Sequence, residues 1–347
     1  MAEITTYGDI SPAVAAWSVV TMLKRGLPYL HFEKFGQTYT LPTNSTTTAK
    51  FRRYFLSGAT GSAGTGTGAY FTPVATTPLV EGVTPTGRKL ANQDYTVTLN
   101  QYGDYVTITD VVADTHTDQV LSQATEILGE SAALTKEILR FNVLKAGTNV
   151  FRGGAVAARN LIVTAPTLTD MRRVATGLNR QNARKISSVL ASTPDFNTKS
   201  VEASFMVVCH PDLESDFRGM AGWKPVADYG PHMTPFESEI GSIEQFRVMT
   251  STVCAPYADL GGANAALRAT TSAATAIDVY PILVFGRDAY GIVPLKGKSS
   301  ITPMVVNPKP ASGDPLAQRG TVGYKFWDGT VILQQAFMAV LEVGATA

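Results

Sequence analysis

The sequence predicts an α+β fold in which a long arm projects from a mixed body. Residues 51–109 alternate like two strands around a Gly/Thr-rich apex, and a long amphipathic helix follows at once. Later strands and helices mix without the regular alternation of a doubly wound sheet. The apex has few large apolar residues to bury against its own subunit, so we expect a neighbouring chain to order the arm. The pattern indicates assembly rather than chemistry.

The composition is that of a globular protein with few charges. The 347 residues are 44% hydrophobic, and 29 lysines and arginines against 28 acidic residues leave a net charge of +1. Contact with a polyanion is therefore expected to be weak and local. The first residues lack the pattern of a secretory signal, which predicts synthesis in a cytosol. In that compartment we expect Cys209 and Cys254 to be buried thiols rather than a disulfide.

The N-terminal region predicts a short helix followed by an extended segment. Ser11 and Pro12 form a helix start, and Gly26 ends the helix that spans 12–25. Isolated aromatic residues and a Thr/Asn-rich end occupy 30–48. This composition is typical of an arm that lies along another part of the structure.

The large hairpin is predicted from strand-like residues on both sides of a glycine-rich apex. Its first strand is 51–56, and glycines recur between Gly58 and Gly68. In the return strand the apolar residues change from odd to even positions across Tyr102-Gly103-Asp104. Such a shift at a glycine predicts a bulge or bend, and we expect the arm to leave the body there.

A long helix is predicted from Thr117 to about Ala146. Its apolar residues recur at helical spacing, at Val120, Ala124, Ile127, Leu134, Ile138 and Phe141. Lys136, Arg140 and Lys145 stand towards its C-terminal end, where the helix dipole favours cations. At about 45 Å this helix would form the backbone of a flat or elongated subunit.

The second half of the chain predicts one further long helix and several strands. The helix spans 169–186, and its basic residues are interpreted as a solvated polar face, with phosphate contact as the weaker alternative. A short helix is expected to open at His210-Pro211-Asp212. Strands are predicted at 205–209, 245–249, 279–285 and 331–343.

The sequence predicts no catalytic, metal-binding or cofactor-binding residues. Residues 291–299 end in Gly-Lys-Ser, but the first glycine is one position too early for a phosphate-binding loop and Pro294 stiffens the segment. The four histidines have no ligand spacing. His210 beside Cys209 fits a helix-capping turn better than a catalytic pair. We therefore expect a protein that is not an enzyme and has no cofactor.

A succession of short motifs extends over nearly the whole chain. The motifs are TYGDISP at 6–12, MLKR at 22–25, EKFG at 33–36, KFRRY at 50–54, EGVTP at 81–85, QYGD at 101–104, TD at 109–110, HPDL at 210–213 and AYG at 289–291. In this order they resemble the major capsid protein family of N-four-type tailed bacteriophages. The resemblance implies the Hong Kong 97-like fold. It also implies a virion protein, made in the bacterial cytoplasm, that self-assembles as hexamers and pentamers into an icosahedral shell around double-stranded DNA.

The resemblance also implies a division of the chain. Its parts are an N-terminal arm at 1–49, an extended loop at 50–104, a peripheral domain at 105–166 with its spine helix at 117–146, an axial domain at 167–298, and a return to the peripheral domain at 299–347. Polar contacts between subunits are expected at the root and far side of the extended loop, from Arg52, Arg53, Glu81, Arg88 and Lys89.

Other partners follow from the same resemblance. They are decoration, portal and separate scaffolding proteins, and weak non-specific contact with packaged DNA, with no membrane. Two alternatives stay open at this point. One is another self-assembling virion component, such as a tail-tube or decoration protein, and the other is a nucleotide-binding enzyme with its site near Lys298.

Overall fold

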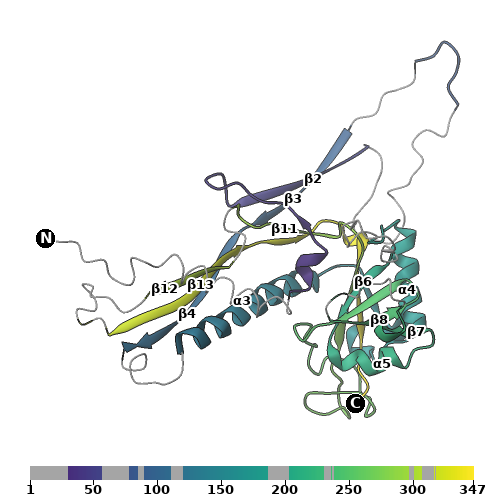
Figure 1. The fold of residues 1–347 in the computed structure, drawn as a ribbon. Helices are drawn as coiled ribbons and strands as arrows, with labels where there is room; N and C mark the ends of the chain where they lie inside the picture. The colour runs from purple at the N-terminus through teal and green to yellow at the C-terminus, as the bar shows by residue number, and fades with distance from the viewer. Residues whose placement is uncertain are drawn as a thin grey trace.

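The fold consists of a compact body, a long sheet backed by a helix, and a two-stranded arm (Figure 1). The computed structural model describes residues 30–56, 78–84, 90–110, 120–186, 203–229, 236, 238–296, 301–306, 316 and 318–347. The predicted N-terminal helix, the glycines between Gly58 and Gly68, Arg88, Lys89 and Lys298 lie outside the described residues.

The body is built on a mixed seven-stranded sheet. Its strands, in spatial order, are β5 (Val150–Arg152), β15 (Met338–Val343), β10 (Tyr280–Phe285), β6 (Phe205–Cys209), β9 (Phe246–Thr250), β8 (Glu239–Ile243) and β7 (Trp223–Pro225). The pairs β5–β15 and β6–β9 are parallel, and the other neighbours are antiparallel. The last strand of the chain, β15, therefore lies inside this sheet, between the edge strand β5 and β10.

Both faces of this sheet are buried, which explains its continuous apolar runs. One face packs against α4 (Leu168–Arg180) and the turn containing α5 (Glu214–Arg218), and Val207 belongs to that core. Val208 points to the opposite face and packs with Phe32 and Phe141. Because successive strand residues alternate between faces, every residue of β6 must be apolar. The prediction of a buried strand at 205–209 is confirmed.

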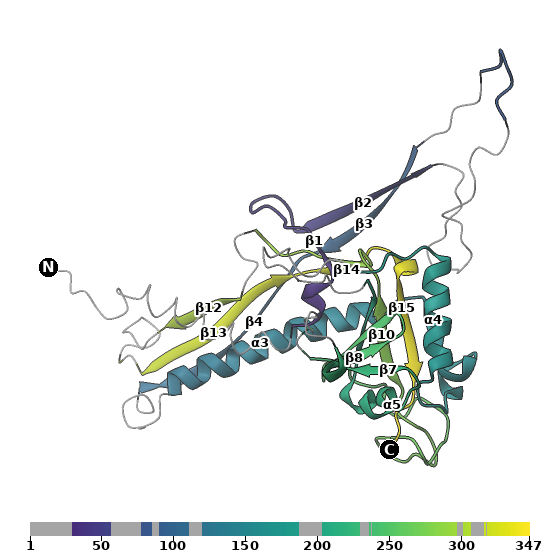
Figure 2. The ribbon, with the colours of Figure 1, turned by 45° about the vertical axis from the view of Figure 1, so that its right-hand side comes forward.

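A second, antiparallel sheet extends away from the body. Its strands, in order, are β12 (Thr302–Val306), β13 (Arg319–Asp328) and β4 (Asn100–Thr109). The helix α3 (Val120–Leu144) lies along one face of this sheet (Figure 2). Its Leu128 and Ala132 pack there against Val322 and Phe326. The predicted long helix is confirmed over its described part, and it links the far end of this sheet to the body.

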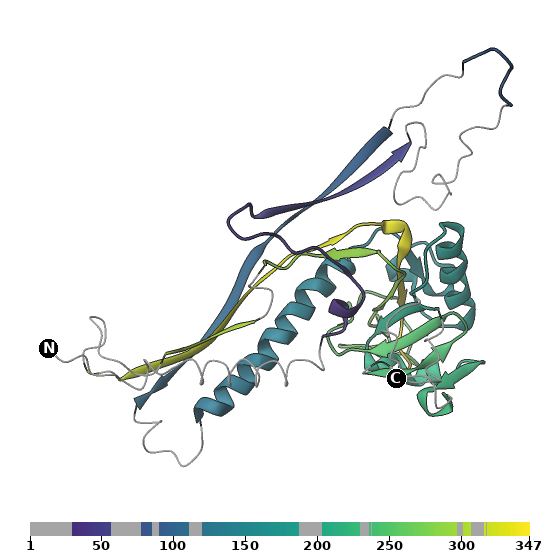
Figure 3. The ribbon, with the colours of Figure 1, turned by 45° about the horizontal axis from the view of Figure 1, so that its top comes forward.

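The arm is an antiparallel pair of nine-residue strands. The strand β2 (Thr48–Leu56) pairs with β3 (Leu90–Thr98) without a register shift. At its base Ala49 and Val97 enter a small core with Leu41 and Val293. A three-stranded sheet beside this base has the order β1 (Gln37–Thr38), β11 (Tyr290–Ile292) and β14 (Thr330–Ile332). Beyond the base the arm projects away from the rest of the subunit (Figure 3).

The predicted bulge at Gly103 is wrong. The strand β4 pairs continuously with β13 from Asn100 to Thr109, and the chain leaves the arm at Leu99, between β3 and β4. The change in apolar parity is real, but it arises because β3 and β4 belong to different sheets. Glycine at 103 has another reason: a Cβ there would lie 2.6 Å from the carbonyl oxygen of Tyr324.

Several other predicted boundaries and faces are corrected. The helix α4 ends at Arg180, and the predicted strand 331–343 is divided into β14 and β15 by a 3-10 turn. On α3, Ile127 and Ile138 are exposed, whereas Lys136 and Arg140 are buried. The segment considered for phosphate binding begins within the buried strand β11, which excludes a phosphate-binding loop at this glycine.

Candidate subunit interface

The N-terminal segment is anchored to α3 by a buried carboxylate. The backbone N–H of Phe32 donates to both carboxylate oxygens of Glu137, at 3.3 Å each. The carbonyl oxygen of Phe32 accepts a hydrogen bond from the Tyr290 hydroxyl at 2.5 Å. All three side chains are fully buried. The segment that leads into the arm is therefore fixed to the helix and to the small sheet at once.

Next to this contact, Arg140 joins three distant parts of the chain. Its guanidinium lies 3.0 Å from a carboxylate oxygen of Asp328 and 3.3 Å from one of Glu33, and Lys136 reaches the same Glu33 oxygen at 3.4 Å. The Arg140 side chain is 1% exposed. Burial opposes its charge, but the acidic neighbours outweigh burial and the pKa of Arg140 is raised.

The same cluster explains why Glu137 differs from its acidic neighbours. Lys136 and Arg140 lie closer to Glu33 and Asp328 than to Glu137, whose nearest carboxyl oxygen is 3.9 Å from the guanidinium of Arg140. Burial raises the pKa of Glu137 to about 7, against the opposing effect of Arg140. Burial alone would also raise the pKa of Glu33, but Arg140 and Lys136 outweigh it and that pKa is lowered.

We expect Glu137 to make the unassembled subunit less stable as the pH rises from 6 to 8. Its folded pKa of about 7 is above the ordinary 4.5, so between these values the folded state binds more protons than the unfolded state. The stabilisation is complete below the ordinary pKa and is lost as the pH passes the folded value. Urea unfolding should show that wild type loses roughly 1 kcal/mol more over this interval than E137Q. Equal losses for the two proteins would contradict the shift.

At the arm, the predicted contact residues fall into two groups. Arg52 makes a bidentate pair with Asp94 of the opposite strand, with N–O distances of 2.7 and 2.9 Å, and its side chain is half exposed. Arg53 donates to the side-chain oxygen of Gln334 and so links the arm to the body. Glu81 is exposed in a turn at the outer end of the arm. The structure thus brings Arg52 and Arg53 together and leaves Glu81 elsewhere.

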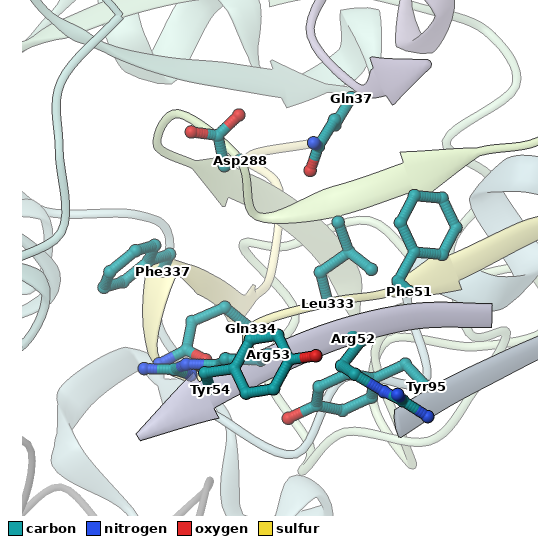
Figure 4. Close-up of a pocket in the computed structure, with 10 residues that line it drawn as sticks. All are labelled: Gln37, Phe51, Arg52, Arg53, Tyr54, Tyr95, Asp288, Leu333, Gln334 and Phe337. Carbon is teal, nitrogen blue, oxygen red and sulfur yellow. The ribbon is translucent and has the colours of Figure 1, made fainter. Parts of the chain in front are cut away.

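A cavity of about 430 Å³ lies between the arm and the body (Figure 4). Arg53, Gln334 and Tyr54 lie close together in it, and Asp288 and Gln37 stand at the opposite side. Its other lining residues are Phe51, Arg52, Tyr95, Leu333 and Phe337. The sequence pattern indicated Arg52 and Arg53 but not Gln334, because the partner of Gln334, Arg53, lies 281 residues away in the chain.

The sheet β12–β13–β4 exposes apolar side chains on the face that points away from α3. Tyr105 and Met304 stand on either side of Gly323, and they are 68% and 46% exposed. Val306, on the same face, is 55% exposed. Neighbouring exposed apolar side chains on several strands are typical of a surface that another protein covers.

The residues considered for chemistry have structural roles. The Nδ1 atom of His210 accepts a hydrogen bond from the backbone N–H of Asp212, which confirms the predicted helix cap. Cys209 and Cys254 are free and buried, as predicted, and burial raises the pKa of both thiols. Among the described residues there is no His, Cys, Asp and Glu group suited to a metal ion. No helix in the described part of the chain is long and apolar enough to cross a membrane.

The fold resembles solved phage capsids over most of the chain. The capsid of Ralstonia phage GP4 matches with a TM-score of 0.60 and 15% identity, covering 91% of each chain. The capsid of cyanophage P-SCSP1u gives a TM-score of 0.54 and 15% identity, over 91% of this chain and 88% of the other. The capsid of cyanophage Pam1 matches with a TM-score of 0.53 and 14% identity, covering 93% of this chain and 92% of the other. The predicted α+β, Hong Kong 97-like fold is confirmed.

The sequence itself matches a family model. The model describes a phage capsid protein and matches residues 93–340, from the return strand of the arm to β15. No curated protein sequence matches the chain. The matched segment is well over half of the sequence and contains α3 and nearly all of the body. The chain belongs to the phage capsid protein family and is a structural protein of a bacteriophage virion, not an enzyme.

Proposed function

We propose that this capsid protein assembles as hexamers and pentamers, and that these build the icosahedral shell enclosing the double-stranded DNA of a tailed phage. The observation that supports this most strongly is the arm. Its hairpin is packed at the base, around Ala49 and Val97, while Tyr54 further along is 61% exposed. A two-stranded hairpin of this kind is marginal in water and gains stability from a surface that covers it. A neighbouring subunit would supply that surface.

The domain division follows the same logic. We propose an N-terminal arm at 1–49, an extended loop at 50–104, a peripheral domain at 105–166 and 299–347, and an axial domain at 167–298. Support comes from α3 and its sheet for the peripheral part and from β6 to β10 for the axial part. The body also takes β5 and β15 from outside 167–298, so its sheet is completed by the peripheral segments.

Arg52, Arg53, Glu81, Arg88 and Lys89 are proposed to make polar contacts between subunits. For the described members, support comes from their position on the arm and from the exposure of Arg52 and Glu81. The net charge of +1 supports weak, non-specific contact with packaged DNA, because few phosphates would be neutralised by the shell. Decoration, portal and separate scaffolding proteins are the proposed additional partners.

We also propose that the chain belongs to the N-four-type group of major capsid proteins. Support comes from the succession of nine short motifs between Thr6 and Gly291. Electron microscopy of the expressed protein tests the assembly proposal directly. Closed shells with hexamers and pentamers are expected, and open tubes or single rings as the only product would instead indicate a tail component.

Deleting residues 58–68 should leave a folded subunit but lower the yield of shells by about tenfold or more. The sequence predicts that this glycine-rich segment is the apex of the arm, and the hydrophobic core of the subunit does not need it. Circular dichroism checks folding, and sedimentation with electron microscopy counts shells. A Gly/Ser replacement of equal length is the control for arm length. A wild-type yield of shells from the deletion would contradict an assembly role for the apex.

A further inference from the structure

The first half of α4 carries arginines whose charges are neutralised within the subunit. The Nε atom of Arg172 donates to a carboxylate oxygen of Glu244 at 2.8 Å. Arg173 pairs with Asp170, one helical turn earlier, at 2.8 Å. The helix packs on the opposite face of the body sheet from α3, so α3 does not cover its outer side (Figure 2). These ion pairs explain the first arginines without any ligand.

The C-terminal end of α4 is different, because its cations have no acidic partner. Arg180, Arg184 and Lys185 lie close together in the sequence. In the described part of the chain no carboxylate forms an ion pair with any of them. The two arginines are exposed, and the lysine is half-buried with its ammonium 5.8 Å from the centre of the Phe205 ring. Their charges are therefore not neutralised within the described structure.

A fourth cation joins this end of the helix from another part of the chain. After α4 the chain turns back at Asn182, which has a φ of +52°. The backbone N–H of Arg287, in the turn after β10, then donates to the carbonyl oxygen of Arg184 at 2.8 Å. A Cβ on Gly286 would lie 2.6 Å from that same oxygen, so the close approach requires glycine. Two segments distant in the sequence thus carry their cations on neighbouring stretches of backbone.

The cationic surface, defined as Arg180, Arg184, Lys185 and Arg287, contains one acid at its edge. Asp288 lies 3.6 Å from Arg287, and their side chains are 50% and 60% exposed. Four cations against one carboxylate leave a local excess of positive charge, in a chain whose net charge is only +1. An anionic partner would relieve the repulsion among these cations.

The polar character of this surface indicates the kind of anion. Asn179 and Asn182 are exposed beside the arginines, and none of the exposed large hydrophobic residues of the described chain belongs to α4 or to either turn. Protein interfaces have buried apolar or aromatic side chains at their centre, whereas arginine and asparagine are typical contacts of DNA phosphates. With no exposed aromatic side chain to stack on a base, the surface suits double-stranded rather than single-stranded DNA.

We propose that the cationic surface lies on the inner side of the shell and binds the phosphate backbone of the enclosed double-stranded DNA. This inference rests on the proposed function and names the place where the shell contacts its contents. Each copy neutralises only a few phosphates, so its binding is weak and independent of base sequence. Repetition over the shell adds these weak contacts together.

Fluorescence anisotropy with a short labelled DNA duplex tests the surface on the unassembled subunit. R180Q/R184Q should lower the affinity by at least about tenfold and reduce the slope of log affinity against log salt by about 2, because two phosphate contacts are lost. Circular dichroism should show a wild-type fold, since both side chains are exposed. Wild-type protein that does not bind the duplex at low salt would overturn the inference.

The matched control is K224Q/R218Q, which removes the same charge from exposed positions on β7 and α5. It should bind the duplex within about twofold of wild type, because these cations lie outside the cationic surface. An equal loss of affinity in the two double variants would show that binding follows net charge, and it would overturn the assignment to this surface.

Competition with poly-L-glutamate distinguishes DNA from an acidic protein segment. At equal concentration of negative charge, it should displace the duplex at least about tenfold less effectively than unlabelled DNA, because the duplex has the denser charge and releases more counterions. Equal competition would indicate an acidic protein as the partner and would overturn the contact with DNA.

Cysteine labelling tests the inner position in assembled shells. R184C introduces an exposed thiol, and the natural cysteines are buried. A small maleimide should react with R184C in closed shells, whereas a maleimide on a long polyethylene glycol chain should react only after the shells are dissociated. Reaction of both reagents with intact shells would place the surface outside, and reaction of neither would place it between subunits. Either result overturns the proposed contact.

The outcomes also separate this inference from the proposed function, because the duplex assay needs no shells. Shells together with binding that depends on Arg180 and Arg184 support both. Shells whose subunits show no such binding overturn the cationic surface alone. Such binding by a wild-type protein that forms no shells overturns the proposed function and leaves the phosphate-binding surface supported.

Discussion

Replacing Arg140 with alanine is expected to destabilise the unassembled subunit by about 3–5 kcal/mol. The guanidinium is 1% exposed and lies 3.0 Å from Asp328, whose side chain is 4% exposed. It also reaches Glu33 at 3.3 Å. Without Arg140, the Asp328 carboxylate would stay buried but would lose the cation that it pairs with. The loss is therefore larger than the net value of one ion pair.

Urea unfolding measures this loss, and R218A is the matched control. Arg218 pairs with Glu214 one helical turn away, but its side chain is 51% exposed, so its removal should change stability by about 0.5 kcal/mol or less. The double variant R140M/D328L should be more stable than R140A, because it removes the stranded carboxylate together with its partner. An R140A loss as small as that of R218A would show that the cluster does not stabilise the fold.

This charged cluster illustrates what the sequence could not predict. The long helix was predictable from its apolar spacing and its length, and Lys136 and Arg140 suit its C-terminal half as dipole partners. Their burial depends on Glu33 and Asp328, which come from segments 107 and 188 residues away from Arg140. Periodicity describes one helix at a time, and so it cannot show that cations on that helix meet acids from two other segments.

Some strands were predictable from the local sequence and others were not. The strand β6 was predictable because both of its faces are buried, which requires an unbroken apolar run that stands out in the sequence. The strand β12 alternates between exposed and half-buried residues and contains Pro303, so it has a weak local signal. It forms because β13 provides a complete antiparallel partner along its length. Tertiary pairing, rather than propensity, decides strands of this kind.

The arm shows that a correct pattern can be assigned to the wrong place. The change in apolar parity occurs where the chain passes from β3 to β4 at Leu99. The bend was predicted four residues further along the chain because Gly103 stands there. That glycine is required by the close approach of Tyr324, an effect of packing and not of bending. A glycine in a strand has two explanations, and only the partner strand distinguishes them.

The candidate interface was partly predictable. Arg52 and Arg53 stood out as adjacent charges on a strand, and they do lie at the cavity. No local pattern indicated Gln334, because a single glutamine in an apolar stretch becomes informative only when its side-chain amide is found buried. Ile127 and Ile138 show the opposite error, since helical spacing assigned them to the core of the subunit and the structure exposes both.

The second large effect is expected for F32A, which should lower the free energy of unfolding by about 3–5 kcal/mol. The ring is fully buried between Phe141 of α3 and Phe285 of β10, with ring centroids at 6.5 and 6.4 Å. Truncation leaves a cavity where the N-terminal segment meets both the helix and the body. The control Y105A removes an aromatic ring that is 68% exposed, so it should change stability by about 0.5 kcal/mol.

The stability losses of F32A and R140A should also be less than additive in a double-mutant cycle. The backbone of Phe32 is held by Glu137, and Glu33 beside it is held by Arg140, so each variant loosens the contact that the other removes. We expect F32A/R140A to lose at least about 1 kcal/mol less than the sum of the single losses. Simple additivity in urea unfolding would mean that the N-terminal segment is held by two independent contacts. Coupling would instead identify one anchoring unit, which fixes the segment to α3 before it enters the arm and so determines where the arm emerges from the subunit.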